Sequence, residues 1–424
     1  MRVLIVNTSE QTGGAAVAAN RLMKALNNNG VKTLMVVRDK DTNDPNVVSL
    51  KNNLFTRWRF LWERWCIFLH LRFNRRHLFD LDIANTGHDI TRLPAFRKAD
   101  VIHLHWVNQG FLSLSDLRKI LESGKPVVWT MHDMWPATGI CHLTLDCQNY
   151  RKSCRNCAYL PAHGSASDLS AKVWRRKRDL LKQYNVFFVA CSRWLEGEAK
   201  RSGLLSGQKV TSIPNPIDMH LFAPGNKHEA RQLFGLPQDK RLILFVAQRT
   251  TNPNKGMNYL AEACKILSED DSFNRQDIGL VVLGGHSEEL KELFPYPVYS
   301  LGYISQAQTI AQVYRCADVF VLPSLSENLP NTIMEAMSCG VPCVGFRIGG
   351  IPEEIDHGKN GYVAAYKDAS DLARGIRWVL READTEALSH SAIQKVSRQY
   401  SQSSVARRYQ EVYEEAMAYK RFKL

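Results

Sequence analysis

The chain has 424 residues, of which 45% are hydrophobic and 23% are charged. This composition is ordinary for a globular protein, the length is sufficient for two domains, and it contains neither a low-complexity tract nor a short repeat. The formal net charge of +13 favours phosphorylated or other anionic partners, but no nucleic-acid-binding module accompanies it, so we expect no nucleic-acid partner.

The chain starts directly on an apolar strand pattern, without a cleavable signal segment, and no apolar run approaches the length of a membrane-spanning helix. Ten cysteines in such a chain argue against a disulfide framework. We therefore expect a cytoplasmic protein, and a basic aromatic segment described below leaves open a location at the inner face of the membrane.

Strand and helix patterns alternate through the first half of the chain. A buried strand at 2–7 leads through a glycine turn into a helix at 15–29, which Gly30 ends. Further strands are predicted at 31–37, 99–106, 126–133, 185–192 and 210–218. Strands separated by helices favour a parallel sheet that is covered on both faces.

The same alternation restarts near residue 240. Strands are predicted at 241–248, 278–285, 298–303, 317–323, 341–346 and 361–366, with helices at 257–267 and 331–340. Prolines between residues 214 and 226 mark a hinge between the two halves.

The alternation predicts an α/β protein made of two doubly wound, Rossmann-like domains. We place the first domain at 1–215, with a cysteine-rich insert at 141–157, and the second at 216–400. The remainder, 401–424, is helical and charged, and we expect it to pack back on the first domain.

The stretch SENLPNTIMEAMSCG lies between two strand patterns of the second domain. It places Glu327 in a loop and Glu335 about one turn inside a helix that begins near Pro330. The unpaired N–H groups and the positive dipole end of such a helix favour phosphate, while Glu335 would bind two hydroxyls such as those of a ribose. The alternative is that Glu335 is a surface helix residue and Glu327 a solvated loop residue.

Nearly the full length of the chain is covered by a series of motifs: TGGAA, VIHLHW, TMHDMWP, ACS, IPNPIDMHLFAP, VLGG, SLGYIS and ENLPNTIMEAMSCGVPCVGFRIGGIPEEIDHGKNGYV. In this combination the chain resembles the retaining nucleotide-sugar glycosyltransferases of family four, also described as group 1. The resemblance implies the GT-B fold, in which two Rossmann-like domains face a cleft. The first domain would lie on the acceptor side, and the second would hold the nucleotide-sugar donor.

The resemblance assigns roles to four residues of the second domain. It implies that Glu327 contacts the donor sugar as a catalytic residue and that Glu335 contacts the ribose. It also implies that main-chain amides around Asn331 and Thr332 meet the diphosphate.

A further implication is that an arginine and a lysine hold the diphosphate after the first strand of the second domain. In FVAQRTTNPNKG, Lys255 with the following Gly256 matches this pattern. Arg249 lies one residue further from the lysine than in the common pattern and lacks the preceding glycine, so a surface arginine is the alternative. Two cations opposite a helix start would stabilise the departing diphosphate, so we expect no metal or other cofactor to be needed for catalysis.

In the first domain, Gly13 and Gly14 follow the first strand and would let the backbone approach the donor, although a plain strand-to-helix turn also requires a glycine. His132 matches the family's active-site histidine, which implies contact with the sugar through its side chain or its backbone carbonyl. His103 and His105 alternate along one strand, so that one would face the cleft and the other the core.

The insert CHLTLDCQNYRKSCRNC holds Cys141, Cys147, Cys154 and Cys157. Four thiols that end in a Cys-x-x-Cys pair indicate a structural zinc site beside the acceptor cleft. An iron–sulfur cluster or four free thiols are the alternatives.

Residues 54–78 combine tryptophans with six arginines: Arg57, Arg59, Arg64, Arg72, Arg75 and Arg76. Apolar residues recur at helical spacing and define one face, formed by Leu54, Trp58, Leu61, Trp65 and Phe68. Such a helix would lie in a membrane interface, which suits a lipid-linked acceptor, or would cover the sheet of the first domain.

We therefore expect a retaining hexosyltransferase that uses a UDP- or GDP-linked sugar and a saccharide or lipid-linked acceptor, in polysaccharide or lipopolysaccharide assembly. The alternatives are an epimerase-like enzyme of the same fold and an NAD-binding enzyme. Asp39, after the second strand, is the feature that favours NAD, whereas the Gly-x-Gly-x-x-Gly pattern is missing.

Overall fold

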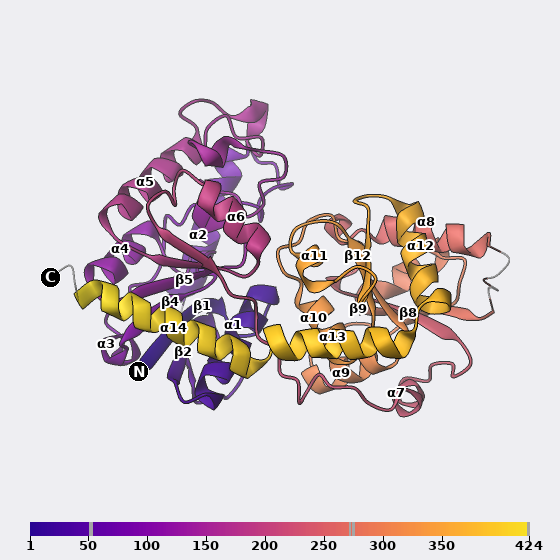
Figure 1. Ribbon diagram of the computed structural model, residues 1–424. Helices are drawn as coiled ribbons and strands as arrows, with labels where there is room; N and C mark the ends of the chain where they lie inside the picture. Colours follow the sequence, from indigo (N-terminus) through magenta and orange to yellow (C-terminus); the bar gives the residue numbers. More distant parts are fainter. Residues whose placement is uncertain (51–53, 271–272, 274–275, 422–424) are drawn as a thin grey trace. The chain divides into compact units, whose positions relative to one another are not determined.

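The computed structural model describes residues 1–50, 54–270, 273 and 276–421 (Figure 1). The chain divides into two compact units, one formed by Met1–Pro214 with Val405–Leu424 and the other by Asn215–Ser404. Each unit contains its own parallel sheet with helices between most consecutive strands, so the predicted α/β fold class with two doubly wound parts is confirmed.

The sheet of the first unit has the strand order β3-β2-β1-β4-β5-β6-β7. All of its neighbouring strands pair in parallel. The strands are β1 (Arg2–Ser9), β2 (Lys32–Asp39), β3 (Val47–Ser49), β4 (Val101–Leu104), β5 (Val127–Met131), β6 (Phe187–Ala190) and β7 (Lys209–Ser212).

Alternate side chains of these strands enter two different cores. Val3 and Ile5 of β1 belong to one core, and Leu4 and Val6 belong to the other, as the two-residue period of a strand requires. The first core is closed by the helices α1 (Gly14–Asn28) and α14 (Gln402–Arg421). The second is closed by α2 (Leu54–His70), α3 (Pro94–Lys98), α4 (Leu114–Glu122), α5 (Leu169–Gln183) and α6 (Arg193–Arg201).

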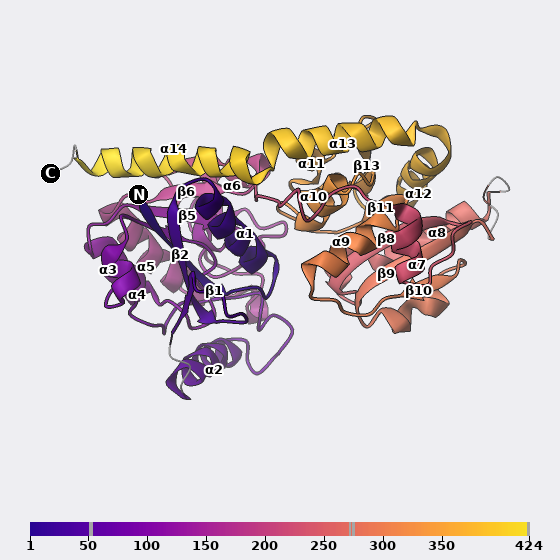
Figure 2. The same cartoon turned by 90° about the horizontal axis from the view of Figure 1, so that it is seen from below.

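The helix α2 lies on the outside of the first unit (Figure 2). It turns its tryptophans towards the surface and a charged pair towards the interior. It buries Glu63, Arg64 and Ile67, whereas Trp58 and Trp65 are about half exposed. The predicted alternative in which the tryptophans cover the sheet is therefore wrong, because the buried side of the helix carries its charged pair. The side chain of Leu54 lies outside the described residues.

The sheet of the second unit has the order β10-β9-β8-β11-β12-β13, again with parallel neighbours. Its strands are β8 (Arg241–Arg249), β9 (Ile278–Gly285), β10 (Val298–Ser300), β11 (Val319–Leu322), β12 (Cys343–Phe346) and β13 (Gly361–Ala364). Its helices are α7 (Lys227–Leu233), α8 (Met257–Ser268), α9 (Ala307–Arg315), α10 (Asn331–Ser338), α11 (Ile351–Glu354), α12 (Ala369–Arg377) and α13 (Thr385–Gln399).

Each sheet reverses its strand order once, between β1 and β4 in the first unit and between β8 and β11 in the second. At such a reversal the loops after the two strands diverge, and open parallel sheets bind ligands there. The loop that contains Lys255 follows β8, and the loop that contains Glu327 follows β11. The order of the strands therefore brings the two predicted donor loops to one place.

Among the described residues, no helix is both long enough and apolar enough to cross a lipid bilayer.

Candidate active site

In the second unit, the two loops at the strand reversal meet through an ion pair. The Nζ atom of Lys255 lies 2.5 Å from Oε1 of Glu327. Both side chains keep some exposure, 30% for the lysine and 13% for the glutamate, so a ligand can reach them. The structure thus brings together two residues that the sequence placed 72 positions apart.

The helix α10 begins beside this pair without a side-chain cap. Pro330 occupies the N-cap position, where it has no side-chain acceptor, and Asn331 and Thr332 open the helix. The Nδ2 atom of Asn215 donates to Oδ1 of Asn331 over 3.0 Å, which fixes the direction of that side chain. A helix start of this kind retains the amide donors and the partial positive charge that favour an anion.

Glu335 lies one turn into α10 and is only 8% exposed. The hydroxyl of Tyr314, from α9, donates a hydrogen bond of 2.8 Å to its Oε2. The alternative of a surface helix residue is therefore wrong. Tyr314 was missed because nothing in the sequence distinguishes it from a core aromatic residue.

Two glycines allow the loops of the site to approach one another. At Gly256, which has φ +70°, a Cβ atom would overlap the carbonyl oxygen of Pro323 at the end of β11. At Gly349, which has φ +55°, a Cβ atom would overlap the carbonyl oxygen of Glu327. The positions of Lys255 and Glu327 therefore depend on glycine at both contacts.

Arg249 lies at the exposed end of β8. Between Val246 and Arg249 the pairing of β8 with β9 shifts by one residue, which is a local irregularity of the strand just before Arg249. No ion pair of Arg249 is found within the described part of the chain. Its contact with a diphosphate stays a prediction.

Glu354, in α11, is fully buried, and its two carboxylate oxygens have no hydrogen-bond partner among the described residues. Burial, reinforced by the charge of Glu327, raises the pKa of this carboxyl well above its usual range. Nothing in the sequence marks Glu354 as buried, because the charged groups around it, such as Glu327 and Lys395, are remote in the chain.

In the first unit, Gly13 and Gly14 form the turn into α1. Gly13 is the N-cap with φ 91° and ψ 161°, a conformation that residues with a side chain rarely adopt, while a Cβ atom there would meet nothing within 4 Å. Glycine is thus required by the backbone of the turn and not by lack of space. A contact with the donor remains a prediction.

His132 directly follows β5, and both of its ring nitrogens face groups of the first unit. Its Nε2 lies 2.9 Å from Nδ1 of His105, and its Nδ1 lies 3.5 Å from Sγ of Cys191. Burial lowers the pKa of His132 to about 4, so the ring is neutral at neutral pH.

His103 and His105 have different hydrogen-bond partners. His105 contacts His132, whereas His103 bonds the hydroxyls of Tyr413 and Thr130, each over 2.7 Å. Burial lowers the pKa of both histidines. His103 is therefore a core residue, and His105 orients the predicted active-site histidine.

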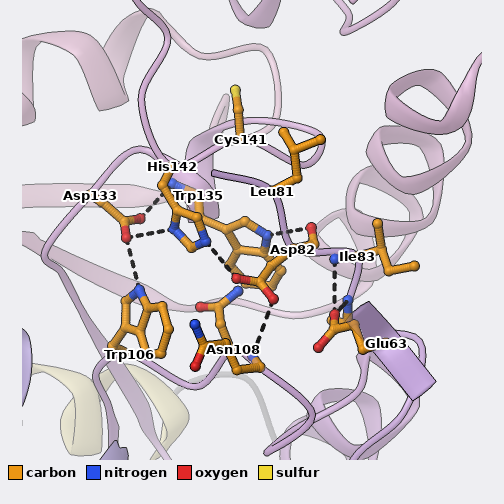
Figure 3. Close-up of polar contacts among 12 residues, drawn as sticks. Glu63, Leu81, Asp82, Ile83, Trp106, Asn108, Asp133, Trp135, Cys141 and His142 are labelled. Carbon is orange, nitrogen blue, oxygen red and sulfur yellow. Dashed lines mark hydrogen bonds and ion pairs between the residues drawn. The ribbon is translucent and has the colours of Figure 1, made fainter. Parts of the chain in front are cut away.

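Next to His132, Asp133 belongs to a buried network that the sequence analysis missed (Figure 3). His142 bonds Oδ2 of Asp133 through Nδ1 over 2.7 Å and Oδ2 of Asp82 through Nε2 over 2.6 Å. Burial alone would lower the pKa of His142, but the two carboxylates raise it to about 10. His142 is therefore a buried cation that joins two segments of the first unit.

The network continues into α2. Arg64 forms a close ion pair with Asp82. Oε1 of Glu63 accepts hydrogen bonds from the backbone of Ile83 and Ala84 (Figure 3). Burial and the charge of Asp82 raise the pKa of Glu63 to about 7. These contacts link α2 to the segment that carries Asp133.

The predicted zinc site has no support in the structure. Cys141 and Cys154 are buried and Cys147 and Cys157 half-buried, and all four are free thiols. Within the described ranges no group of three or more His, Cys, Asp or Glu side chains is placed to hold a metal ion.

Metal-dependent glycosyltransferases use Asp-x-Asp triplets, and the chain contains two, at 39–41 and 80–82. Three of their four aspartates have ion-pair partners within the first unit: Asp39 pairs with Arg38, Asp80 with His77 and Asp82 with Arg64 and His142.

The comparisons with known proteins agree with the two units. Solved structures with the same two-domain GT-B fold include sucrose-phosphate synthase from Thermosynechococcus elongatus, with a TM-score of 0.68 and 18% identity over 98% of this chain and 99% of that one. Another is HepE from Anabaena in complex with UDP-glucose, with a TM-score of 0.64 and 16% identity over 98% of this chain and 100% of that one. At these identities the likeness shows the fold.

The sequence comparisons add the family. Residues 12–221 match the family described as "Glycosyltransferase Family 4", and residues 240–382 match "Glycosyl transferases group 1". An uncharacterized glycosyltransferase from Methanocaldococcus jannaschii is 31% identical over 365 residues, 81% of this chain and 91% of the relative. The chain belongs to this glycosyltransferase family.

Other relatives match over a shorter stretch. The D-inositol 3-phosphate glycosyltransferase of Actinosynnema mirum is 32% identical over 201 residues, which are 44% of this chain and 47% of the relative. The match thus spans about half the length of such relatives.

Proposed function

We propose that the chain is a retaining glycosyltransferase that moves a hexose-type sugar from a UDP- or GDP-linked donor to a saccharide or lipid-linked saccharide, as in polysaccharide or lipopolysaccharide assembly. The observation that carries the proposal is the arrangement at α10, where a lysine–glutamate pair and a buried glutamate surround an uncapped helix start.

The donor would bind with its diphosphate against the first amides of α10, around Asn331 and Thr332. Glu335, held in place by Tyr314, would accept hydrogen bonds from the two ribose hydroxyls. This carboxylate is already desolvated and oriented, so little reorganisation accompanies binding.

The pair of Lys255 and Glu327 would exchange partners when the donor binds. The ammonium group of Lys255 would move to the diphosphate, which develops negative charge as the sugar departs, and Arg249 would add a second cation. Glu327 would then be released to accept hydrogen bonds from the sugar hydroxyls. A partly exposed pair suits this role, because separating it costs less than separating a fully buried one.

Retention requires the acceptor to attack on the face from which the diphosphate leaves. The departing phosphate oxygen would take the proton of the acceptor hydroxyl, so no separate protein base is needed. His132 has both ring nitrogens turned to groups of its own unit, which favours its backbone carbonyl as the contact with the sugar. His105 is then a positioning residue.

The printed names of the relatives suggest which compounds to test first. HepE from Anabaena was solved with UDP-glucose, so UDP-glucose is the first donor. Inositol 3-phosphate belongs in the acceptor panel because several relatives are named after it.

The proposal is tested by thermal-shift measurements with UDP, GDP and NAD, followed by product analysis with a donor panel. We expect stabilisation by one nucleoside diphosphate and a product whose anomeric configuration matches that of the donor. Stabilisation by NAD alone would favour the dehydrogenase alternative, and inversion at the anomeric carbon would contradict the retaining mechanism.

A further inference from the structure

The outward face of α2 and of the turn after it is unusually apolar. Its large side chains are between 43% and 70% exposed, and they are Phe55, Trp58, Leu61, Trp62, Trp65, Leu69 and Phe73. Five of them recur at alternating steps of three and four residues, which places them on one side of the helix. Trp58 and Trp62 stack on each other with ring centroids 5.4 Å apart, so the face is a continuous surface and not a set of isolated side chains.

This face is fixed in its outward orientation by the polar network on the opposite side. Glu63 and Arg64 are buried, and they are bound to Asp82 and to the backbone of Ile83 and Ala84. Turning the helix over would expose apolar residues such as Ile67 to water and break a buried ion pair, which is strongly destabilising. The exposure of the aromatic residues is therefore a property of the folded unit.

The exposed charges between residues 54 and 79 are of one sign, and Asp80, which follows, is paired with His77. Arg57, Arg72, Arg75 and Arg76 are exposed, whereas the one acidic residue between 54 and 79 is the buried Glu63. Arg72 and Phe73 have φ values of 50° and 64°, and this turn places an exposed aromatic ring among the arginines.

We propose that this surface, formed by the exposed residues of 55–76 and here named the α2 docking face, binds the interface of an anionic lipid membrane. Tryptophan and phenylalanine side chains partition into the boundary between headgroups and acyl chains, and arginines beside them pair with anionic headgroups. The helix α2 lies on the outside of the first unit, where a lipid surface can reach it (Figure 2). The inference goes beyond the proposed transfer reaction and does not depend on it.

The test is co-sedimentation of the full-length protein with vesicles of phosphatidylglycerol and phosphatidylcholine, compared with vesicles of phosphatidylcholine alone. We expect about tenfold tighter binding to the anionic vesicles, which 500 mM NaCl abolishes. No activity is measured, so the result is independent of whether the enzyme transfers a sugar. A wild-type protein that fails to sediment with anionic vesicles would overturn the proposal.

Two matched pairs of variants locate the binding. Arg75→Ala with Arg76→Ala should weaken it about 30-fold, from roughly 1 kcal/mol for each arginine. The control replaces two other consecutive exposed arginines, Arg175 and Arg176 of α5, by alanine. It lowers the net charge by the same amount and should leave vesicle binding close to that of the wild type. Equal losses in the two variants would show a general charge effect and overturn the assignment.

For the apolar part, Trp58→Ala with Trp65→Ala should weaken binding by about tenfold or more. The control is Tyr303→Ala with Leu293→Ala, which removes exposed apolar side chains of the second unit. Sedimentation velocity without lipid gives a further outcome. If the wild type dimerises and the tryptophan variant does not, the face serves self-association and the lipid proposal is wrong.

Discussion

The two units hold their charged groups in different ways. In the second unit, Lys255 and Glu327 form a partly exposed pair beside a helix start that has no side-chain cap. In the first unit, the charged network around His142 is buried, and its carboxylates have partners within the unit. A partly exposed pair can exchange its partner for a ligand, whereas a buried network is costly to open.

This difference separates a binding surface from a scaffold. In the proposed function the groups of the second unit meet the charged donor, so their removal should affect turnover with little effect on stability. The network of the first unit connects α2, the segment at Asp82 and the residue after His132. Its removal should mainly lower the stability of the protein, and it should affect activity only by displacing His132.

The largest effect is expected from Lys255→Ala. Removing the cation that stabilises the departing diphosphate should lower kcat by about 100- to 1,000-fold, because the charge develops in the transition state. The melting temperature should stay within about 1 °C of the wild type, since a partly exposed pair contributes little to stability. Lys265→Ala, on the exposed side of α8, is the control. Full activity of the Lys255 variant would remove this residue from the site.

A smaller effect on activity, but the largest on stability, is expected from His142→Gln. The folded state raises the pKa of this histidine to about 10 from its ordinary 6.5, so its stabilising contribution is complete below pH 6.5 and is lost as the pH rises towards 10. At pH 6 the free energy of unfolding of the variant should be about 3 kcal/mol below that of the wild type, since two buried carboxylates lose their cation. At pH 10 the difference should be smaller, because the wild-type histidine has then lost much of its charge.

Thermal unfolding of this variant between pH 6 and 10 checks the claim. The exposed His220 gives the control variant His220→Gln, which should melt like the wild type at every pH. If the His142 variant instead shows the same dependence of melting temperature on pH as the wild type, the network is not the scaffold described above.

A still smaller effect is expected from Tyr314→Phe, which removes one hydroxyl. Glu335 would keep its place in α10 but lose its hydrogen bond, so we expect about tenfold weaker binding of the nucleoside diphosphate. Isothermal titration calorimetry measures the change, with Tyr303→Phe as the exposed control. Unchanged affinity would separate Glu335 from the nucleotide.

The smallest effect is expected from chelation. We expect EDTA to leave the initial rate unchanged, because the proposed cations for the diphosphate are Lys255 and Arg249. The thermal stability should also stay the same, since the described cysteines form no metal-binding group. An immediate loss of rate that Mg²⁺ restores would contradict the first expectation, and zinc found by elemental analysis would contradict the second.

The sequence predicted the fold class because strand and helix periodicity is a local pattern, whereas the donor roles of Glu327, Glu335 and Lys255 came from the family resemblance and stay predictions. Strand periodicity defined the two sheets, and the motif with Glu327 and Glu335 lies within one loop and one helix. Tyr314 and Glu354 were missed because their roles come from contacts across elements that no local pattern records. The network of Glu63, Asp82 and His142 was missed for the same reason, and the cysteines beside it suggested a metal site instead.

The helix α2 shows a second limit of prediction from sequence. Its amphipathic pattern was visible, but an amphipathic pattern does not say which face is buried. In this chain the charged pair Glu63 and Arg64 finds partners inside the unit, so the apolar face turns outwards.

The most direct test of the account is a crystal structure of the protein with the nucleoside diphosphate that stabilises it. The account predicts phosphate oxygens within hydrogen-bonding distance of the first amides of α10, Lys255 turned from Glu327 to the diphosphate, and the ribose on Glu335. A nucleotide bound elsewhere, with the start of α10 empty and the Lys255–Glu327 pair intact, would contradict it.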